Sequence, residues 1–438
     1  MKDKELVPVK NMDIKLDDAT LLAKAKETGF MKRIRKFGPV DFIRSLCVVA
    51  LYATVSLEGF ATVLGLVAGS TISKQSLWER INSRCIAFVR SALFSLILQA
   101  SNLVPLKHGG AFSHFRRVLL QDSTTIGLPE SMAHLFPGPS NQTGKGSATM
   151  KIQFIHELLS ESCLHMGISG FTRNDQRASP DILEFAGPGD LIIRDLGYFT
   201  LKVFRALGQR GAYFLTPYWH KVNLYTQDGK KIDLLKLLKK YSTVDTLVLA
   251  GSEERLPLRL IASPVPETIA QIRRRKLIEN KERDRRLNPK KEQLELLGWD
   301  IFLTNVGEDI WDTSTALKVY GLRWRVEIIF KSWKSHFHLD SIPQKTSDSY
   351  IELLIYSRLI FITLFQSFYA ELVYANAGKP LSLLKTAQFV QQHMWAILLS
   401  LFSSQMAQLV LVQILKHCTY ETRQKRRNFH EKLSAFLT

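Results

Sequence analysis

Cysteine is scarce in this chain, and its few residues are scattered. The four are Cys47, Cys85, Cys163 and Cys418, and no two of them form a C-x-x-C pair. This spacing excludes a zinc-finger framework and a disulfide-stapled secreted domain. The sequence therefore indicates a protein of a reducing compartment.

Long uninterrupted apolar runs are lacking too. Residues 46–70, 351–373 and 394–415 are apolar, but Glu or Arg interrupts the first two and glutamine the third. Because such groups are costly in hydrocarbon, buried helices of a globular protein are favoured over a membrane protein with a basic face. The polar N-terminus also lacks the apolar segment of a secretory signal.

Acidic residues are outnumbered. Lys and Arg total 59 against 40 for Asp and Glu, which leaves a formal net charge of +19. Such an excess indicates a polyanionic partner, and nucleic acid is favoured over an anionic membrane or a basic protein that binds neither. The chain has 438 residues, of which 46% are hydrophobic, enough for two or three folded domains.

The chain begins with a segment, residues 1–110, whose apolar positions recur at helical spacing. Within it, Ser73 is a small polar cap before a basic and aromatic helix, as in the second helix of a helix-turn-helix. An amphipathic packing helix explains the same pattern equally well. We expect 1–110 to be a helical DNA-binding region.

Residues 111–220 change to short apolar runs typical of strands. The expected strands are Val118–Gln121, Ile152–His156, Cys163–Ile168, Leu191–Arg194 and Ala212–Leu215, with a helix over Thr200–Leu207. This order predicts a mixed sheet with crossover helices, and so the first part of an α/β core.

Residues 221–300 interrupt this pattern and are expected to form an insertion subdomain. Short strands, Thr246–Ala250 and Leu258–Ala262, precede a very basic helical run over Thr268–Gln293. Contact with DNA and a solvated charged face are equally open explanations of that run. The core is expected to resume with the strand Asp300–Asn305 in its second part, 301–345, before a helical C-terminal region, 346–438.

The most informative stretch is a predicted helix that leads to Lys334, with Asp312 as a candidate N-cap. At about 100° per residue, one stripe of this helix is polar and the opposite stripe is apolar. The polar stripe holds Tyr320, Arg323, Glu327, Lys331 and Lys334; the apolar one holds Leu322, Val326, Ile329 and Trp333. Salt bridges one turn apart would explain Glu327 alone.

Two aspartates earlier in the chain are further candidate functional residues beside Glu327. Asp122 and Asp195 each follow an apolar strand run and lead into a short polar turn. Either one alone has the ordinary interpretation of a turn former. Three carboxylates from two strands and a helix, however, are what two Mg²⁺ ions need, because hard cations take oxygen ligands.

These residues resemble a known family. The spacing Tyr320-x2-Arg323-x3-Glu327-x6-Lys334 is similar to the Y-R-E-K signature of DDE transposases of the insertion-sequence-4 type, and the segments from Asp122 and Asp195 resemble its two aspartate boxes. The resemblance covers about residues 110–340. It implies an α/β fold with a ribonuclease H-like catalytic core, a mixed sheet flanked by helices, together with a mainly β insertion and helical N- and C-terminal regions.

The resemblance also implies an activity. It is cut-and-paste transposition of an insertion sequence, by two-metal phosphodiester hydrolysis and strand transfer through a hairpin intermediate. Asp122, Asp195 and Glu327 would be the catalytic residues and would hold two Mg²⁺ ions, with Mn²⁺ able to substitute.

The resemblance implies DNA contacts as well. Tyr320, Arg323 and Lys334 would hold phosphates of the transposon end, and Lys331 shares their face. Trp299 stands where hairpin-forming members stack a flipped base, although a half-buried Trp at the sheet edge is the open alternative. His336 and His338 are expected at the helix C-terminus rather than as metal ligands. The Gly-rich run 141–147 lacks the Walker spacing, so ATP use is not supported.

The implied partner is double-stranded DNA, both the inverted repeats at the transposon ends and the target. A homodimer is expected in the synaptic complex, with no membrane partner, in the bacterial cytoplasm and at the nucleoid when DNA is bound. Two alternatives stay open: a transposase-derived DNA-binding protein that does not cleave, and a different nuclease on the same fold.

Overall fold

The protein is described by a computed structural model that covers residues 17–101, 109–140, 146–283, 289–375, 380–394, 396–397, 404–421 and 428–437. Its contacts divide the chain into two units. Unit 1 comprises residues 1–105, 123–173 and 325–430, and unit 2 comprises residues 106–122, 174–324 and 431–438. The chain crosses between the units five times, and two of these crossings lie near predicted site residues: one after Asp122, inside strand β1 (Arg117–Leu128), and one after Trp324.

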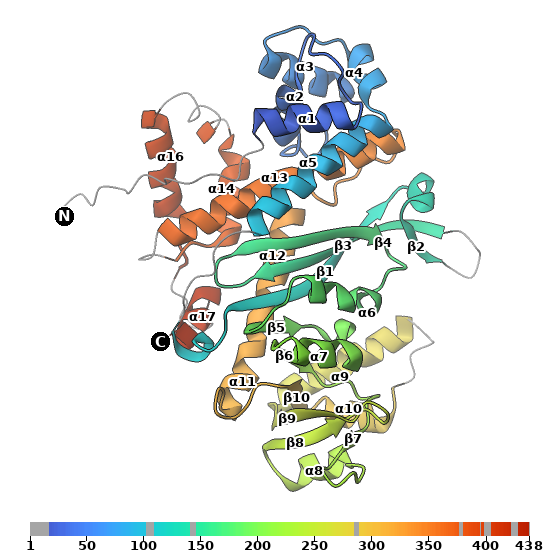
Figure 1. Ribbon diagram of the computed structural model, residues 1–438, viewed down its shortest axis with the longest axis vertical. Helices are drawn as coiled ribbons and strands as arrows, with labels where there is room; N and C mark the ends of the chain where they lie inside the picture. The colour runs from blue at the N-terminus through green and yellow to red at the C-terminus, as the bar shows by residue number, and fades with distance from the viewer. Residues whose placement is uncertain are drawn as a thin grey trace, which may run out of the picture. The chain divides into compact units, whose positions relative to one another are not determined.

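Unit 2 is built on a mixed sheet (Figure 1). The first half of β1 pairs in parallel with β5 (Asp190–Arg194), and β5 pairs in parallel with β6 (Tyr213–Pro217). Leu191, Ile192 and Ile193 are fully buried, which is why a continuous apolar run forms this strand. Helix α7 (Leu201–Gln209) connects β5 to β6, as a parallel pair requires.

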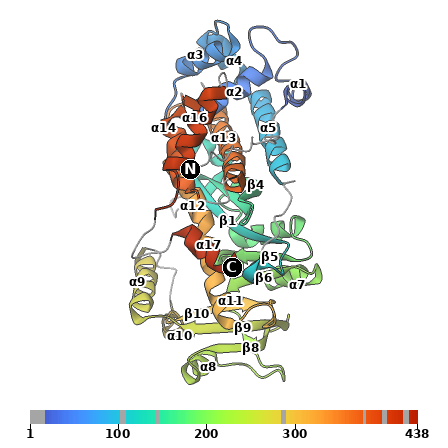
Figure 2. The same ribbon diagram turned by 90° about the vertical axis from the view of Figure 1, so that its left-hand side faces the viewer.

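The remaining strands of unit 2 are antiparallel. The order continues from β6 through β10 (Trp299–Thr304), β9 (Leu256–Pro264) and β8 (Val244–Ala250) to β7 (Leu224–Tyr225). The insertion adds helices α8 (Leu234–Lys240), α9 (Glu267–Arg283) and α10 (Lys291–Leu296) (Figure 2). The basic helical run expected over 268–293 is helical where it is described, as the two elements α9 and α10; residues 284–288 lie outside the described residues.

Unit 1 contains an antiparallel group of strands. Strand β3 (Gly146–Glu157) pairs with β2 (Pro137–Ser140) and with β4 (Ser162–Gly170). The second half of β1 also belongs to this unit. Five of the Gly-rich positions singled out above, 141–145, lie outside the described residues.

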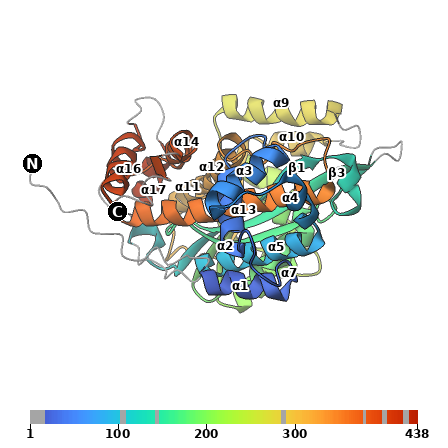
Figure 3. The ribbon, with the colours of Figure 1, turned by 90° about the horizontal axis from the view of Figure 1, so that it is seen from above.

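Helices form the rest of unit 1. The N-terminal ones are α1 (Asp18–Glu27), α2 (Pro39–Val49), α3 (Leu57–Ala68), α4 (Lys74–Arg80) and α5 (Ser83–Ser101), and the C-terminal ones are α13 (Asp348–Ala375), α14 (Leu383–Gln392) and α16 (Ser404–His417). Helix α13 packs against α2 and α5 (Figure 3). It is long and apolar enough to cross a membrane, but 78% of its apolar window is buried, as in a core helix.

The shorter elements complete the order of the described chain. They are η1 (Gly110–Phe112), η2 (Glu130–His134), α6 (Asp175–Ala178), η3 (Ser179–Glu184), η4 (Leu196–Tyr198), α11 (Thr313–Val319), η5 (Tyr320–Arg323), α12 (Trp324–Ser335) and α17 (Phe429–Leu437). The mixed sheet flanked by helices and the helical N- and C-terminal regions confirm the expected fold class.

Two local expectations are wrong. Asp122 is not followed by a turn, because β1 continues to Leu128. The second half of β1 contains Thr124, Thr125 and Ile126, which are β-branched residues that suit a strand. The helix that carries Tyr320 and Lys334 is not continuous. Helix α11 ends at Val319, the 3-10 turn η5 follows, and α12 then begins at Trp324. Gly321 lies in that turn, and glycine is a poor helix former.

Candidate active site

Asp122 and Asp195 lie on neighbouring parallel strands of unit 2. In the β1–β5 register Gln121 is opposite Arg194, so the two aspartates occupy the next position on each strand. Asp195 directly follows β5 and precedes the 3-10 turn η4, as expected for a residue at a strand end. The two carboxylates therefore belong to the same edge of the sheet.

Two residues from η5 contact these aspartates. Arg323 Nη1 lies 2.6 Å from Asp122 Oδ2, and both side chains are largely buried, at 16% and 17% exposed. The Tyr320 hydroxyl donates to Asp195 Oδ1 at 3.4 Å. The guanidinium carbon of Arg323 also stands 5.8 Å from the centre of the Tyr320 ring. Within unit 2 the structure thus brings together four of the predicted site residues.

Tyr320 is held by the sheet. Its ring packs against Phe302 of β10 with the ring centres 4.7 Å apart. Burial raises the pKa of the Tyr320 hydroxyl, so this group stays protonated at neutral pH and remains a hydrogen-bond donor. It can therefore donate to a carboxylate or to a phosphate oxygen.

A buried pair next to the aspartates was not expected from the sequence. Arg194 Nη1 donates to Gln121 Oε1 at 3.1 Å and to the Ser179 carbonyl at 3.0 Å, and burial lowers the pKa of Arg194 to about 9. These two side chains immediately precede Asp195 and Asp122, so their hydrogen bond ties the two strands together below the carboxylates. The sequence signal for this buried pair is the arginine that follows the apolar run Leu191–Ile193.

Trp299 is the first residue of β10, as the sequence predicts. It is half-buried, and its carbonyl accepts a hydrogen bond from Arg273 Nη1 at 3.3 Å. Its backbone pairs with Pro264 of β9. The base-stacking role of the Trp299 side chain stays a prediction.

Glu327, Lys331 and Lys334 belong to α12 in unit 1. Lys331 is exposed, whereas Glu327 and Lys334 are half-buried. Lys334 Nζ donates to the Thr125 carbonyl of β1 at 3.1 Å, three residues after Asp122 in the chain. The opposite face of the segment is buried as expected, because Leu322, Val326, Ile329 and Trp333 are at most 1% exposed.

A buried ion pair fixes the start of α12. Arg325 contacts both carboxylate oxygens of Glu161, at 2.7 and 3.1 Å, and donates to the Tyr369 hydroxyl at 3.1 Å. His156 Nε2 lies 3.1 Å from the same carboxylate. Burial by itself would raise the pKa of Glu161, but Arg325 and His156 hold it below its ordinary value. The pair anchors the helix that presents Glu327.

The histidines near α12 are not placed as a metal site. His336 and His338 follow the last residue of α12, as expected, and each shares a hydrogen bond with Gln391 of α14, at 3.2 and 3.1 Å. Across the described residues, no three side chains of His, Cys, Asp or Glu are grouped as metal ligands. The donors at Asp122 and Asp195 are carboxylate oxygens, which suit a hard divalent cation.

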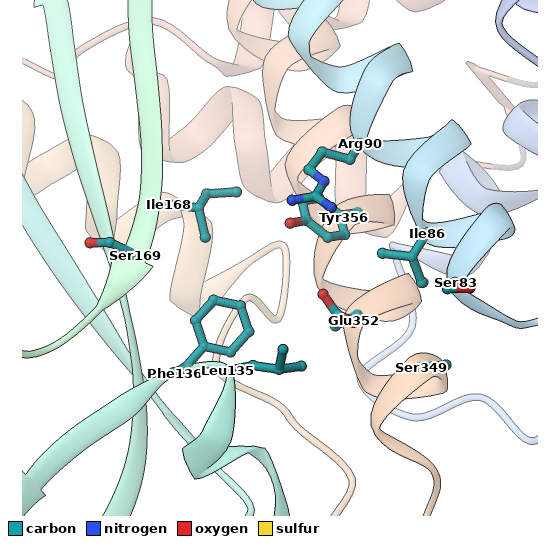
Figure 4. A pocket seen from close by; sticks show the side chains of 10 residues that line it. All are labelled: Ser83, Ile86, Arg90, Leu135, Phe136, Ile168, Ser169, Ser349, Glu352 and Tyr356. Carbon is teal, nitrogen blue, oxygen red and sulfur yellow. The ribbon is translucent and has the colours of Figure 1, made fainter. Parts of the chain in front are cut away.

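Unit 1 also contains a cavity of about 380 Å³ (Figure 4). It is lined by Ser169, apolar side chains such as Phe136, and a polar group of Arg90, Glu352 and Tyr356. Burial raises the pKa of Glu352, and Arg90 opposes that rise. None of the predicted site residues lines this cavity.

Comparison with known proteins decides the family. The family model described as "Transposase DDE domain" matches residues 113–361, more than half of the chain. The chain belongs to the DDE transposase family. The matched range includes every residue of the predicted site.

Two transposases of insertion sequences that are similar to most of the chain agree with this assignment. The transposase for insertion sequence element IS231F of Bacillus thuringiensis subsp. israelensis is 26% identical over 93% of this chain and 90% of its own length. The transposase for insertion sequence element IS1151 of Clostridium perfringens is 25% identical over 78% and 76%. A cryo-EM structure of the piggyBac transposase synaptic complex with hairpin DNA aligns at a TM-score of 0.46 and 13% identity, over 96% of this chain and 82% of that one.

Family membership establishes the class of activity. As a DDE transposase, the protein cleaves DNA and joins the cut strand to a target, and it depends on a divalent metal ion. It binds DNA, as its charge indicates. The expectation of a DDE transposase of the insertion-sequence-4 type is confirmed, whereas the Y-R-E-K signature and the roles of single residues remain predictions.

Proposed function

We propose that this transposase moves an insertion sequence by a cut-and-paste reaction at a site of two Mg²⁺ ions held by Asp122, Asp195 and Glu327. Mn²⁺ would serve in place of Mg²⁺. The observation that carries the proposal is the pairing in unit 2 of Arg323 with Asp122 and of Tyr320 with Asp195. It joins the predicted signature to both aspartate boxes through side-chain contacts.

Each residue would have a definite task. Asp122, Asp195 and Glu327 would hold the metal ions, which would supply activation of the attacking oxygen and stabilisation of the leaving oxygen of a phosphodiester. Arg323 would move from Asp122 to a DNA phosphate, since a guanidinium fork suits either partner. Tyr320, Lys331 and Lys334 would hold further phosphates, and Trp299 would stack the base flipped out when the DNA end closes into a hairpin.

The reaction needs two DNA ends, so we propose a homodimer in the synaptic complex, acting on the terminal inverted repeats and on target DNA. The relatives come from bacteria, which supports a cytoplasmic protein that is found at the nucleoid when DNA is bound. The domain assignment that accompanies this proposal is the one expected from the sequence: 1–110, 111–220, 221–300, 301–345 and 346–438.

The test is cleavage of end DNA by Asp122→Asn, Asp195→Asn and Glu327→Gln variants. Each change keeps the side-chain shape and removes one anionic metal ligand, so cleavage is expected to fall at least a hundredfold while DNA binding persists. Asp309→Asn is the matched control, because Asp309 is an exposed carboxylate of unit 2. Full cleavage by the Glu327→Gln variant would refute the site.

A further inference from the structure

The turn that follows β6 lies at the sheet edge of the aspartates. Strands β5 and β6 are parallel and paired, so their carboxyl ends emerge together: Asp195 follows one, and Tyr218 to Lys221 follow the other (Figure 1). Strand β10 runs antiparallel to β6, and the Tyr218 amide donates to the Ile301 carbonyl at 2.9 Å. The first residue of β10, Trp299, therefore belongs to this edge as well.

Trp219 is tied directly to the Asp195 segment. Its ring packs against Phe199, with the ring centres 6.0 Å apart, and Phe199 is only four residues beyond Asp195. The Val222 amide donates to the Trp219 carbonyl at 2.9 Å, which closes the turn. Phe199 thus holds one side of the half-buried Trp219 indole in place.

A cation occupies the face of this indole. Lys221 Nζ stands 5.4 Å from the centre of the Trp219 ring, and the Lys221 side chain is exposed. Burial and Lys221 hold the pKa of the neighbouring His220 below its ordinary value, so Lys221 is the cation of this turn at neutral pH. Because the Lys221 side chain is exposed, its contact with the indole is weak and is readily exchanged for another partner.

We infer that the Trp219–Lys221 turn is a second binding element for unpaired DNA beside Asp195, in which Trp219 stacks one base and Lys221 binds the adjoining phosphate. Stacking of bases on aromatic rings, with basic groups along the backbone, is how proteins hold single strands without sequence preference. A base would replace the ammonium on the indole face, and the freed ammonium would meet the phosphate. The inference rests on the proposed role of Asp195 only for its place in the reaction.

The test is binding of a fluorescein-labelled oligothymidine of about 15 nucleotides to the full chain without metal, followed by anisotropy at several salt concentrations. Trp219→Ala should weaken binding about tenfold, and Trp219→Phe should restore most of it. Lys221→Gln should reduce the slope of log affinity against log salt by about 0.7, the value for one phosphate on a single strand. A duplex of equal length should show a smaller loss with Trp219→Ala.

Lys230→Gln is the matched control, because Lys230 is an exposed lysine of the same unit that pairs with Asp228. Thermal unfolding of each variant separates a binding defect from a folding defect, and the exposed Lys221 can change without loss of packing. Wild-type affinity and salt slope in both Trp219→Ala and Lys221→Gln would overturn the inference. Because this assay contains no metal and measures binding, whereas the test of the metal site measures metal-dependent cleavage, failure of the metal site and failure of this element are distinguishable.

Discussion

Two arginines on either side of Trp324 form ion pairs of opposite character. Arg323 pairs with Asp122 in unit 2, where both side chains keep some exposure, at 16% and 17%. Arg325 pairs with Glu161 in unit 1, where the two side chains are 1% and 7% exposed and further hydrogen bonds satisfy the guanidinium. A partly solvated pair can exchange partners at low cost, whereas a buried one cannot. The difference distinguishes a pair that can exchange partners from one that fixes the start of α12.

The largest expected effect comes from breaking the buried pair. Arg325→Met leaves Glu161 buried without its cation, and we expect a loss of about 3–5 kcal/mol in the free energy of unfolding. Urea denaturation measures it. A double variant that also carries Glu161→Gln should regain part of that loss, because the uncompensated charge is gone. A single variant as stable as the wild type would contradict the structural role of Arg325.

A smaller loss in the free energy of unfolding is expected when the pH is lowered. The pKa of Glu161 is below its ordinary value in the folded protein, so the pair contributes fully above the unfolded value of about 4.3. That contribution is lost as the pH falls through the folded pKa. The difference in unfolding free energy between wild type and Glu161→Gln should therefore shrink below about pH 4. A difference that is constant with pH would mean that the carboxylate is not the group that Arg325 stabilises.

The smallest effect on stability is expected at Arg323. Asp122 keeps 17% of its side chain exposed, so Arg323→Ala should lower the unfolding free energy by less than Arg325→Met does. Cleavage of end DNA should nevertheless fall on the order of a hundredfold, because a phosphate contact is lost. Arg323→Lys should recover little, since lysine lacks the bidentate fork. Large destabilisation with unimpaired cleavage would reverse the comparison with Arg325.

Local patterns predicted the elements better than the contacts between them. The apolar run that ends at Arg194 predicted β5 and the place of Asp195, because a strand buried on both faces needs such a run. The polar residues after Asp122 wrongly predicted a turn, because the alternating polar and apolar residues of a strand resemble a turn in sequence. The Arg325–Glu161 pair joins residues 164 positions apart, so no local pattern in the sequence predicts it. The position of the Trp219 turn beside Asp195 likewise follows only from the pairing of the strands, which the local sequence does not predict.

The helix expected to carry the signature is divided in the structure. Tyr320 and Arg323 lie in a 3-10 turn and Glu327 in the following α-helix, so a single helical wheel does not describe them. Their contacts with Asp195 and Asp122 still agree with the predicted grouping in unit 2. The Y-R-E-K signature itself stays a prediction, whereas the helical wheel is replaced by the observed turn and helix.

The central claim is that Asp122, Asp195 and Glu327 together hold the metal. Titration of Mn²⁺ into the complex with end DNA, followed by electron paramagnetic resonance, tests it most directly. We predict two bound ions per active site in the wild type and fewer in Glu327→Gln, with the Asp309→Asn control unchanged. Equal occupancy in wild type and Glu327→Gln would contradict the account.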